Sequence, residues 1–144
     1  MLLGLWWVLT TSWPPARQLV DLVAQQLGPL LAGRSTVQLG LLAVLAGVAE
    51  ETLFRGVLQS GLSRIMPEVW ALIGASAIFG LAHFASKAYA AFAGIIGLYL
   101  GGLFLLEENL LAPTVTHALY DFVALLHVSR TSRLRGTLSR TYPE

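Results

Sequence analysis

Apolar residues fill most of this sequence in long segments, and short polar breaks separate the segments. Four segments are long enough for membrane helices, which need about 20 residues each. They are Thr36–Arg64, Glu68–Ala85, Ala88–Leu106 and Leu111–Val128. Prolines and clustered polar residues interrupt helices, and such residues lie between the segments at Pro67, Ser86-Lys87 and Glu107-Glu108-Asn109. The pattern therefore predicts an all-α, polytopic membrane protein with about four transmembrane helices.

The first 35 residues have a different pattern. Residues 1–13 are apolar but too short to span a bilayer, and the tryptophans among them are typical of the headgroup region. No basic stretch precedes them, as it would in a signal peptide. From Ala16 to Leu31, apolar residues recur at helical spacing between polar ones, which predicts an amphipathic helix. We therefore expect an interfacial or partial membrane segment over residues 1–35, followed by a membrane domain over residues 36–128.

Residues 129–144 form a basic tail, which we expect to be disordered or bound to the membrane surface. Its arginines are Arg130, Arg133, Arg135 and Arg140. Positive charges favour the cytoplasmic side of a membrane. If the tail is cytoplasmic, alternating spans place Arg34 and Lys87 on the same side, and only Arg64 disagrees. The sequence thus predicts a multi-pass protein of the cell membrane with a cytoplasmic tail.

Composition supports the membrane class and removes others. Hydrophobic residues make up 56% of the chain and charged residues 12%, whereas soluble domains carry about 25% charged residues. The net charge of +1 lacks the basic surplus that nucleic-acid binding needs. The lipid bilayer is therefore an expected partner, and nucleic acid is not. Without cysteine, the chain has no disulfide and no thiol nucleophile.

Six ionisable residues lie inside the apolar segments. They are Glu50, Glu51 and Arg55 on the first segment, His83 on the second, and His117 and Asp121 on the fourth. An ionised group at the centre of a bilayer costs about 2.5 to 3.5 kcal/mol, so such residues mark function by default. A carboxylate and two imidazoles form a set suited to acid–base catalysis. A buried polar network that only fixes helix register is the alternative.

Spacing predicts which of these side chains share a helix face. Glu51 and Arg55 are four residues apart, which allows an ion pair on one face. His117 and Asp121 have the same spacing. Glu50 is turned by about 100° from its neighbour, so it faces a different surface.

Three motifs carry a resemblance to a known family. Glu50-Glu51-x-x-x-Arg55, Phe79-x-x-x-His83 and His117-x-x-x-Asp121 resemble, in the same order, the motif series of the CAAX protease and bacteriocin-processing family. Its eukaryotic branch is the type II CAAX prenyl endopeptidase. The resemblance covers about Ala43 to Leu126. It implies an intramembrane endopeptidase that hydrolyses membrane-associated or C-terminal peptide substrates, with or without a lipid group.

The resemblance also implies roles for single residues. Glu50 and His83 would activate a water molecule, and His117 and Asp121 would bind the oxyanion. Glu51, Arg55 and Phe79 would support the site. An ionised Asp121 cannot donate a hydrogen bond to an oxyanion, so it would be protonated or would orient His117 instead. No cofactor is expected in this mechanism.

Two alternatives stay open at this point. Two histidines and several carboxylates could ligate zinc at the same residues and leave a position for water, although no HExxH motif is present. The other alternative is a membrane protein without enzymatic activity that binds a peptide, for example in immunity against a bacteriocin.

Overall fold

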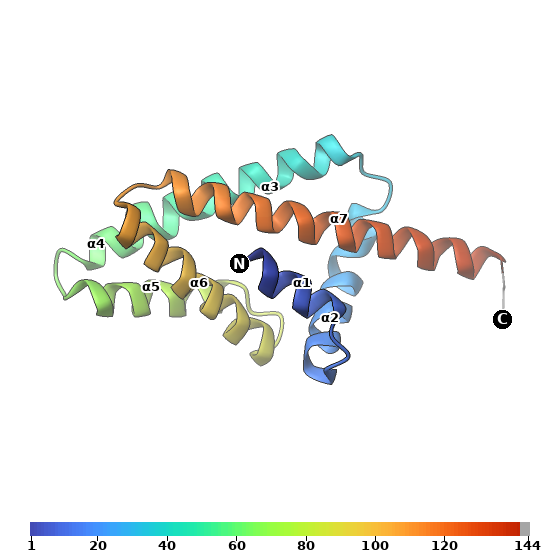
Figure 1. Cartoon of the computed structure of the whole chain (residues 1–144), viewed down its shortest axis with the longest axis horizontal. Coiled ribbons are helices and arrows are strands. Elements are labelled where there is room, and N and C mark those ends of the chain that lie inside the picture. The colour runs from blue at the N-terminus through green and yellow to red at the C-terminus, as the bar shows by residue number, and fades with distance from the viewer. Residues whose placement is uncertain (142–144) are drawn as a thin grey trace. The chain divides into compact units, whose positions relative to one another are not determined.

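The computed structural model describes the backbone of residues 1–141 and the side chains of residue 1 and residues 3–133. Every regular element in this part is a helix (Figure 1). The elements are α1 (Leu2–Thr10), α2 (Pro14–Leu31), α3 (Thr36–Glu51), the π-helix η1 (Thr52–Gln59), α4 (Ser60–Leu62), α5 (Glu68–Ala82), α6 (Lys87–Glu107) and α7 (Leu111–Thr141). The predicted all-α fold class is confirmed. The side chains of Arg135 and Arg140 lie outside the described residues.

Three continuous helical stretches are long and apolar enough to cross a membrane, namely Thr36–Leu62, Lys87–Glu107 and Leu111–Arg133. The remaining apolar helix, α5, has 15 residues and is therefore about 22 Å long. A bilayer core is about 30 Å thick. The second predicted segment thus forms a shorter helix than we expected. It ends because His83 leaves the helical conformation and Ser86 caps the next helix through its side chain.

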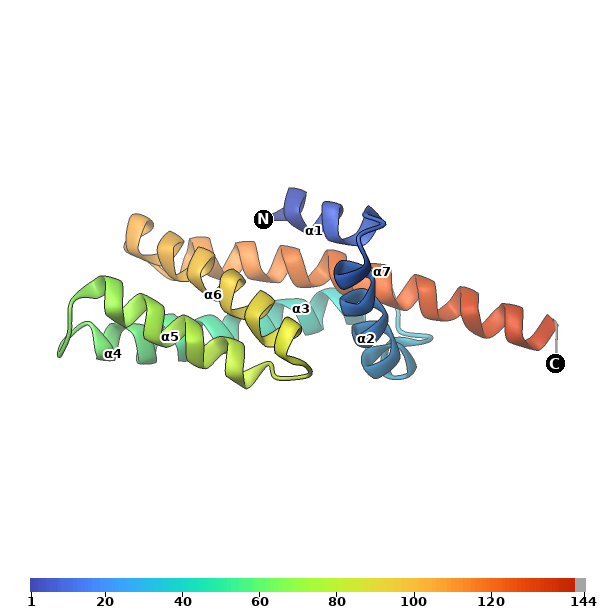
Figure 2. The same ribbon diagram turned by 90° about the horizontal axis from the view of Figure 1, so that it is seen from below.

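One compact unit comprises residues Val44–Ala118. Within it, α5 and α6 lie side by side (Figures 1 and 2). Glycines allow this close packing. A Cβ atom at Gly80 would lie 2.5 Å from the carbonyl oxygen of Ala90 and 3.1 Å from Cα of Gly94. The α5–α6 contact therefore depends on a missing side chain at Gly80.

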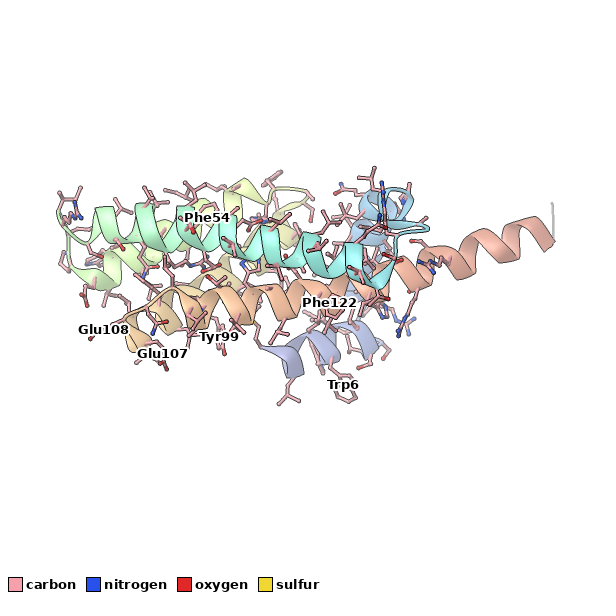
Figure 3. All side chains as sticks on the ribbon, turned by 90° about the horizontal axis from the view of Figure 1, so that it is seen from above. Trp6, Phe54, Tyr99, Glu107, Glu108 and Phe122 are labelled. Atoms are coloured by element: carbon pink, nitrogen blue, oxygen red, sulfur yellow. The ribbon has the colours of Figure 1, made fainter. Side chains whose placement is uncertain are left out.

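The second compact unit combines Met1–Ala43 with α7 from Leu119 onward. The predicted amphipathic helix is present as α2, and it continues through Pro29 to Leu31. The hydrophobic core of this unit contains Ala24, Leu31, Leu39 and Val128. On α1, Trp6 is 65% exposed (Figure 3).

Helix α7 extends further than the sequence suggested. We expected a membrane segment that ends at Val128 and a tail that is disordered or surface-bound, whereas the helix continues to Thr141. No proline interrupts the chain between Val128 and Pro143, so nothing local stops the helix. Residues 129–141 are therefore helical and not disordered, and binding of this tail to the membrane surface stays a prediction.

Candidate active site

The candidate site begins where α3 becomes a π-helix. Glu50 and Glu51 are the last residues of α3, and η1 follows directly. Hydrogen bonds in a π-helix run from residue i to i+5, and short π segments within α-helices are frequent at functional sites. Here the carbonyl oxygen of Arg55 accepts hydrogen bonds from both the backbone N–H and the hydroxyl of Ser60. The segment buries Arg55 and Phe54, the latter labelled in Figure 3.

A buried carboxylate connects two motifs of this site. Oε1 of Glu51 accepts a hydrogen bond from Nη1 of Arg55 at 2.8 Å and lies 2.7 Å from Nδ1 of His117. All three residues are at most 4% exposed. The ion pair predicted from the spacing of Glu51 and Arg55 is present. The contact between Glu51 and His117, 66 residues apart in the chain, was not predicted.

Glu50 faces the two histidines. Its Oε2 atom lies 3.4 Å from Nε2 of His83 and 3.8 Å from Nε2 of His117. The side chains of Glu50 and His83 are each 28% exposed, whereas that of His117 is 6% exposed. Both distances are long for direct hydrogen bonds, and Oε2 of Glu50 has no hydrogen-bond partner among the described residues.

Hydrogen-bond partners determine which nitrogen of each imidazole carries a proton. Nδ1 of His83 lies 2.9 Å from the carbonyl oxygen of Phe79, and a carbonyl only accepts hydrogen bonds. Nδ1 of His117 faces Glu51, whose carboxylate already accepts from Arg55. Both Nδ1 atoms are therefore donors. The two Nε2 atoms, which face Glu50, are then the nitrogens that gain or lose a proton.

Phe79 is the apolar centre of the cluster. Its ring is 3% exposed, and its centroid lies 4.4 Å from that of His83, 6.0 Å from that of His117 and 4.8 Å from that of Phe54. Cζ of Arg55 lies 4.9 Å from the same ring, within the range of a cation–π interaction. Phe79 therefore contacts side chains from all three motifs.

Two further residues, Asp121 and Gln59, bear on the prediction of the site from the sequence. Asp121 lies one turn after His117 on α7, in the compact unit that resumes at Leu119. Nδ1 of His117 contacts Glu51. Both roles considered for Asp121, oxyanion binding in the protonated form and orientation of His117, stay predictions. Gln59 was overlooked, yet it is fully buried. Its signal in the sequence is its position, four residues after Arg55 in an apolar segment.

A comparison with protein families matches residues 32–123 to the type II CAAX prenyl endopeptidase Rce1-like family. The match covers more than half of the 144 residues and contains all three motifs. The chain belongs to this family. Searches of curated proteins and of solved structures found no match. Membership of the Rce1-like family confirms the resemblance of the motifs and identifies a CAAX-type intramembrane protease. Together with the three apolar helices, it also identifies a membrane protein.

Proposed function

We propose that the chain is an endopeptidase in which Glu50 is the general base that activates water. The observation that carries this proposal is the position of Oε2 of Glu50 between the Nε2 atoms of His83 and His117. The Nδ1 atoms of both histidines are held by acceptors, so both Nε2 atoms are directed to the place where a water can bind. The side chains of Glu50 and His83 are each 28% exposed, whereas Oε2 of Glu50 is buried and has no hydrogen-bond partner among the described residues, so it is an acceptor that a bound water would satisfy.

In this mechanism a water donates one hydrogen bond to Glu50 and is oriented by His83. Glu50 takes a proton from the water while the oxygen attacks the peptide carbonyl carbon. Collapse of the tetrahedral intermediate breaks the C–N bond, and Glu50 gives its proton to the leaving amine. Proton transfer by a positioned carboxyl group contributes about 10² to 10⁴ in rate.

His117 suits the stabilisation of the oxyanion. When protonated, it donates from Nδ1 to Glu51, as the 2.7 Å contact indicates, and its Nε2–H is directed to the same space as Glu50. A single oxyanion donor is worth about 10² to 10³ in rate. Asp121 would assist from the next turn of α7.

We infer that the substrates are peptides or proteins at the membrane, cut near their C-terminus, with a prenyl group as the attached lipid. Family members act on substrates of this kind in membranes. The many exposed apolar side chains of α5, including Val69, Trp70 and Leu81, are compatible with a lipid-modified substrate. We further infer that the basic C-terminal end faces the cytoplasm.

The test is cleavage of prenylated and unprenylated C-terminal peptides by purified wild-type protein and by Glu50→Gln. The amide keeps the shape of the side chain but cannot take a proton, so the rate is expected to fall by about 10² to 10⁴. Glu107→Gln, the same change at an exposed end of α6, serves as the control. A folded Glu50→Gln protein that cleaves at the wild-type rate contradicts the proposal.

The same assay separates the two alternatives. No three His, Asp or Glu side chains among the described residues form a group that could hold a metal ion, and the zinc mechanism predicts that chelation abolishes cleavage and that zinc restores it. A peptide-binding immunity protein predicts binding without products, unchanged in Glu50→Gln. Cleavage that resists chelation and requires Glu50 supports the proposed mechanism.

A further inference from the structure

Two side chains of η1 donate hydrogen bonds to the backbone of α6. Nη2 of Arg55 donates to the carbonyl oxygen of Gly97 at 2.8 Å, and Nε2 of Gln59 donates to that of Gly101 at 3.1 Å. Both donors are at most 1% exposed. Arg55 and Gln59 are one turn apart, as are the two glycines, so the contacts form two parallel bridges between the helices. Between Lys87 at its start and Glu107 at its end, helix α6 has no Asp, Glu, Lys, Arg or His residue, yet it binds the guanidinium through its backbone.

A glycine is required at the Gln59 bridge. A Cβ atom at Gly101 would lie 2.6 Å from Oε1 of Gln59, whereas one at Gly97 would lie 3.2 Å from Cβ of Ser76 on α5. At Gly101 the bare backbone lets α6 approach Gln59 this closely. The register of η1 against α6 is therefore set where Gln59 meets Gly101.

The second amino group of Arg55 connects these bridges to the reaction. Nη1 donates to Oε1 of Glu51, which also lies 2.7 Å from Nδ1 of His117. The guanidinium thus has Gly97 on one side and Glu51 on the other. A small shift of η1 along α6 would lengthen the Gly97 contact, and the guanidinium would then hold Glu51 less closely against His117.

Gln59 is not explained as a stabilising residue. Its Oε1 atom is buried and has no hydrogen-bond partner in the part of the chain that the structure describes, which is unfavourable for folding. Gly101 lies inside α6, so its carbonyl keeps the hydrogen bond of the helix itself if the amide is removed. An apolar side chain of the same length would therefore be tolerated by the fold.

We propose that Gln59 is a positioning residue of the proteolytic reaction. By its hydrogen bond to Gly101 it sets the register of η1 on α6, so that Arg55 bridges Gly97 and Glu51 and keeps Glu51 on Nδ1 of His117. This inference rests on the proposed function for its effect on turnover. The positioning of His117 itself can be measured without any substrate.

The experiment compares Gln59→Met with wild type and with Gln26→Met, the same change at an exposed position of α2. Gln59→Met is expected to unfold at the wild-type temperature or above it. Its kcat is expected to fall by about 10- to 100-fold, as for small displacements of groups that orient a reaction, at unchanged KM. Gln26→Met is expected to match wild type in both. The second readout is ¹⁵N and ¹H NMR of the three histidines, in which the Nδ1–H signal of His117 is expected to move in Gln59→Met alone.

Each outcome decides a separate claim. If Gln59→Met is folded and both kcat and the His117 signal are unchanged, the proposal is overturned. If Gln59→Met does not fold, Gln59 is a structural residue and the proposal is equally overturned. If the His117 signal moves but wild type cleaves no peptide, the proposed protease mechanism fails while the positioning of His117 by Gln59 stands.

Discussion

Glu51 shows how a charge is retained inside an apolar helix. Its side chain is completely buried, and the cost of removing a carboxylate from water is several kcal/mol unless partners compensate it. Arg55 supplies the opposite charge, and His117 supplies a second donor. A single oxygen atom therefore joins the first and third motifs. Glu51 contacts one of the proposed reacting groups, His117, although it does not face the space between Glu50 and the Nε2 atoms of the two histidines.

Substitution of Glu51 and Arg55 is expected to separate stability from activity. Glu51→Leu leaves a buried guanidinium without its carboxylate, which should lower the free energy of unfolding by about 3 to 5 kcal/mol. The double variant Glu51→Leu/Arg55→Met should recover most of this loss, because paired apolar residues replace a buried ion pair at little cost. It should remain inactive, because His117 has lost its partner.

Chemical unfolding in detergent together with peptide cleavage measures both effects. A double variant that is as unstable as Glu51→Leu would show that the loss of stability comes from the contacts of Glu51 and Arg55 with His117 and Gly97 and not from an unpaired guanidinium. A double variant that cleaves normally would remove Glu51 from the mechanism.

At the scale of single helices, the sequence predicts the type of each element better than its length. The apolar segment Ala88–Leu106 corresponds closely to α6 (Lys87–Glu107), since polar residues stand at both ends. The π-helix was not predicted, because a periodic pattern cannot distinguish i→i+5 from i→i+4 hydrogen bonding over eight residues. Nor does the pattern show where α5 ends, because Phe84 and Ala85 are apolar residues of a turn.

The packing of α5 on α6 gives a prediction with a matched control. Gly80→Ala places a methyl group 2.5 Å from the carbonyl oxygen of Ala90, so α5 must move away from α6. Overpacking of this kind costs about 1 to 3 kcal/mol, and the displacement also shifts Phe79 and His83. At Gly102 a Cβ atom has no neighbour within 4 Å.

Gly80→Ala is therefore expected to lower both thermal stability and the cleavage rate, while Gly102→Ala leaves both near the wild-type values. Differential scanning fluorimetry and the peptide assay provide the two measurements. Equal effects of the two substitutions would mean that close approach at Gly80 is not required.

At the scale of the whole molecule, six of the seven residues predicted for the site fall within Val44–Ala118. Five of these six are ionisable residues, which are conspicuous in apolar segments, and Phe79 was identified by the resemblance of its motif. The sequence does not show that Glu51 meets His117, since contacts between helices depend on rotation and register that spacing within one helix leaves open. Spacing within one helix likewise left the position of Asp121 open. It shares a helix with His117 but belongs to the other compact unit.

The orientation of the chain in the membrane can be tested directly, because the sequence contains no cysteine. Single cysteines at Arg34 and Glu107 provide labelling sites in an otherwise unreactive chain. The positive-inside rule predicts that Arg34→Cys reacts only when a membrane-impermeant maleimide reaches the cytoplasmic face, and that Glu107→Cys reacts from the opposite face. Labelling of intact and permeabilised cells is the measurement, and the reverse pattern would invert the proposed topology.

The short helix α5 also affects the lipid around it. After Glu68 at its first position, its exposed side chains are apolar, from Val69 and Trp70 to Ile78 and Leu81. Its length of about 22 Å is some 8 Å less than the thickness of an average hydrocarbon core. Such a hydrophobic mismatch is relieved when acyl chains next to the helix compress. If α5 spans the bilayer, such thinning would bring the aqueous phase toward the end of α5 that carries His83. Membrane thickness, set by acyl-chain length and sterol content, would then determine how easily water reaches the proposed general base.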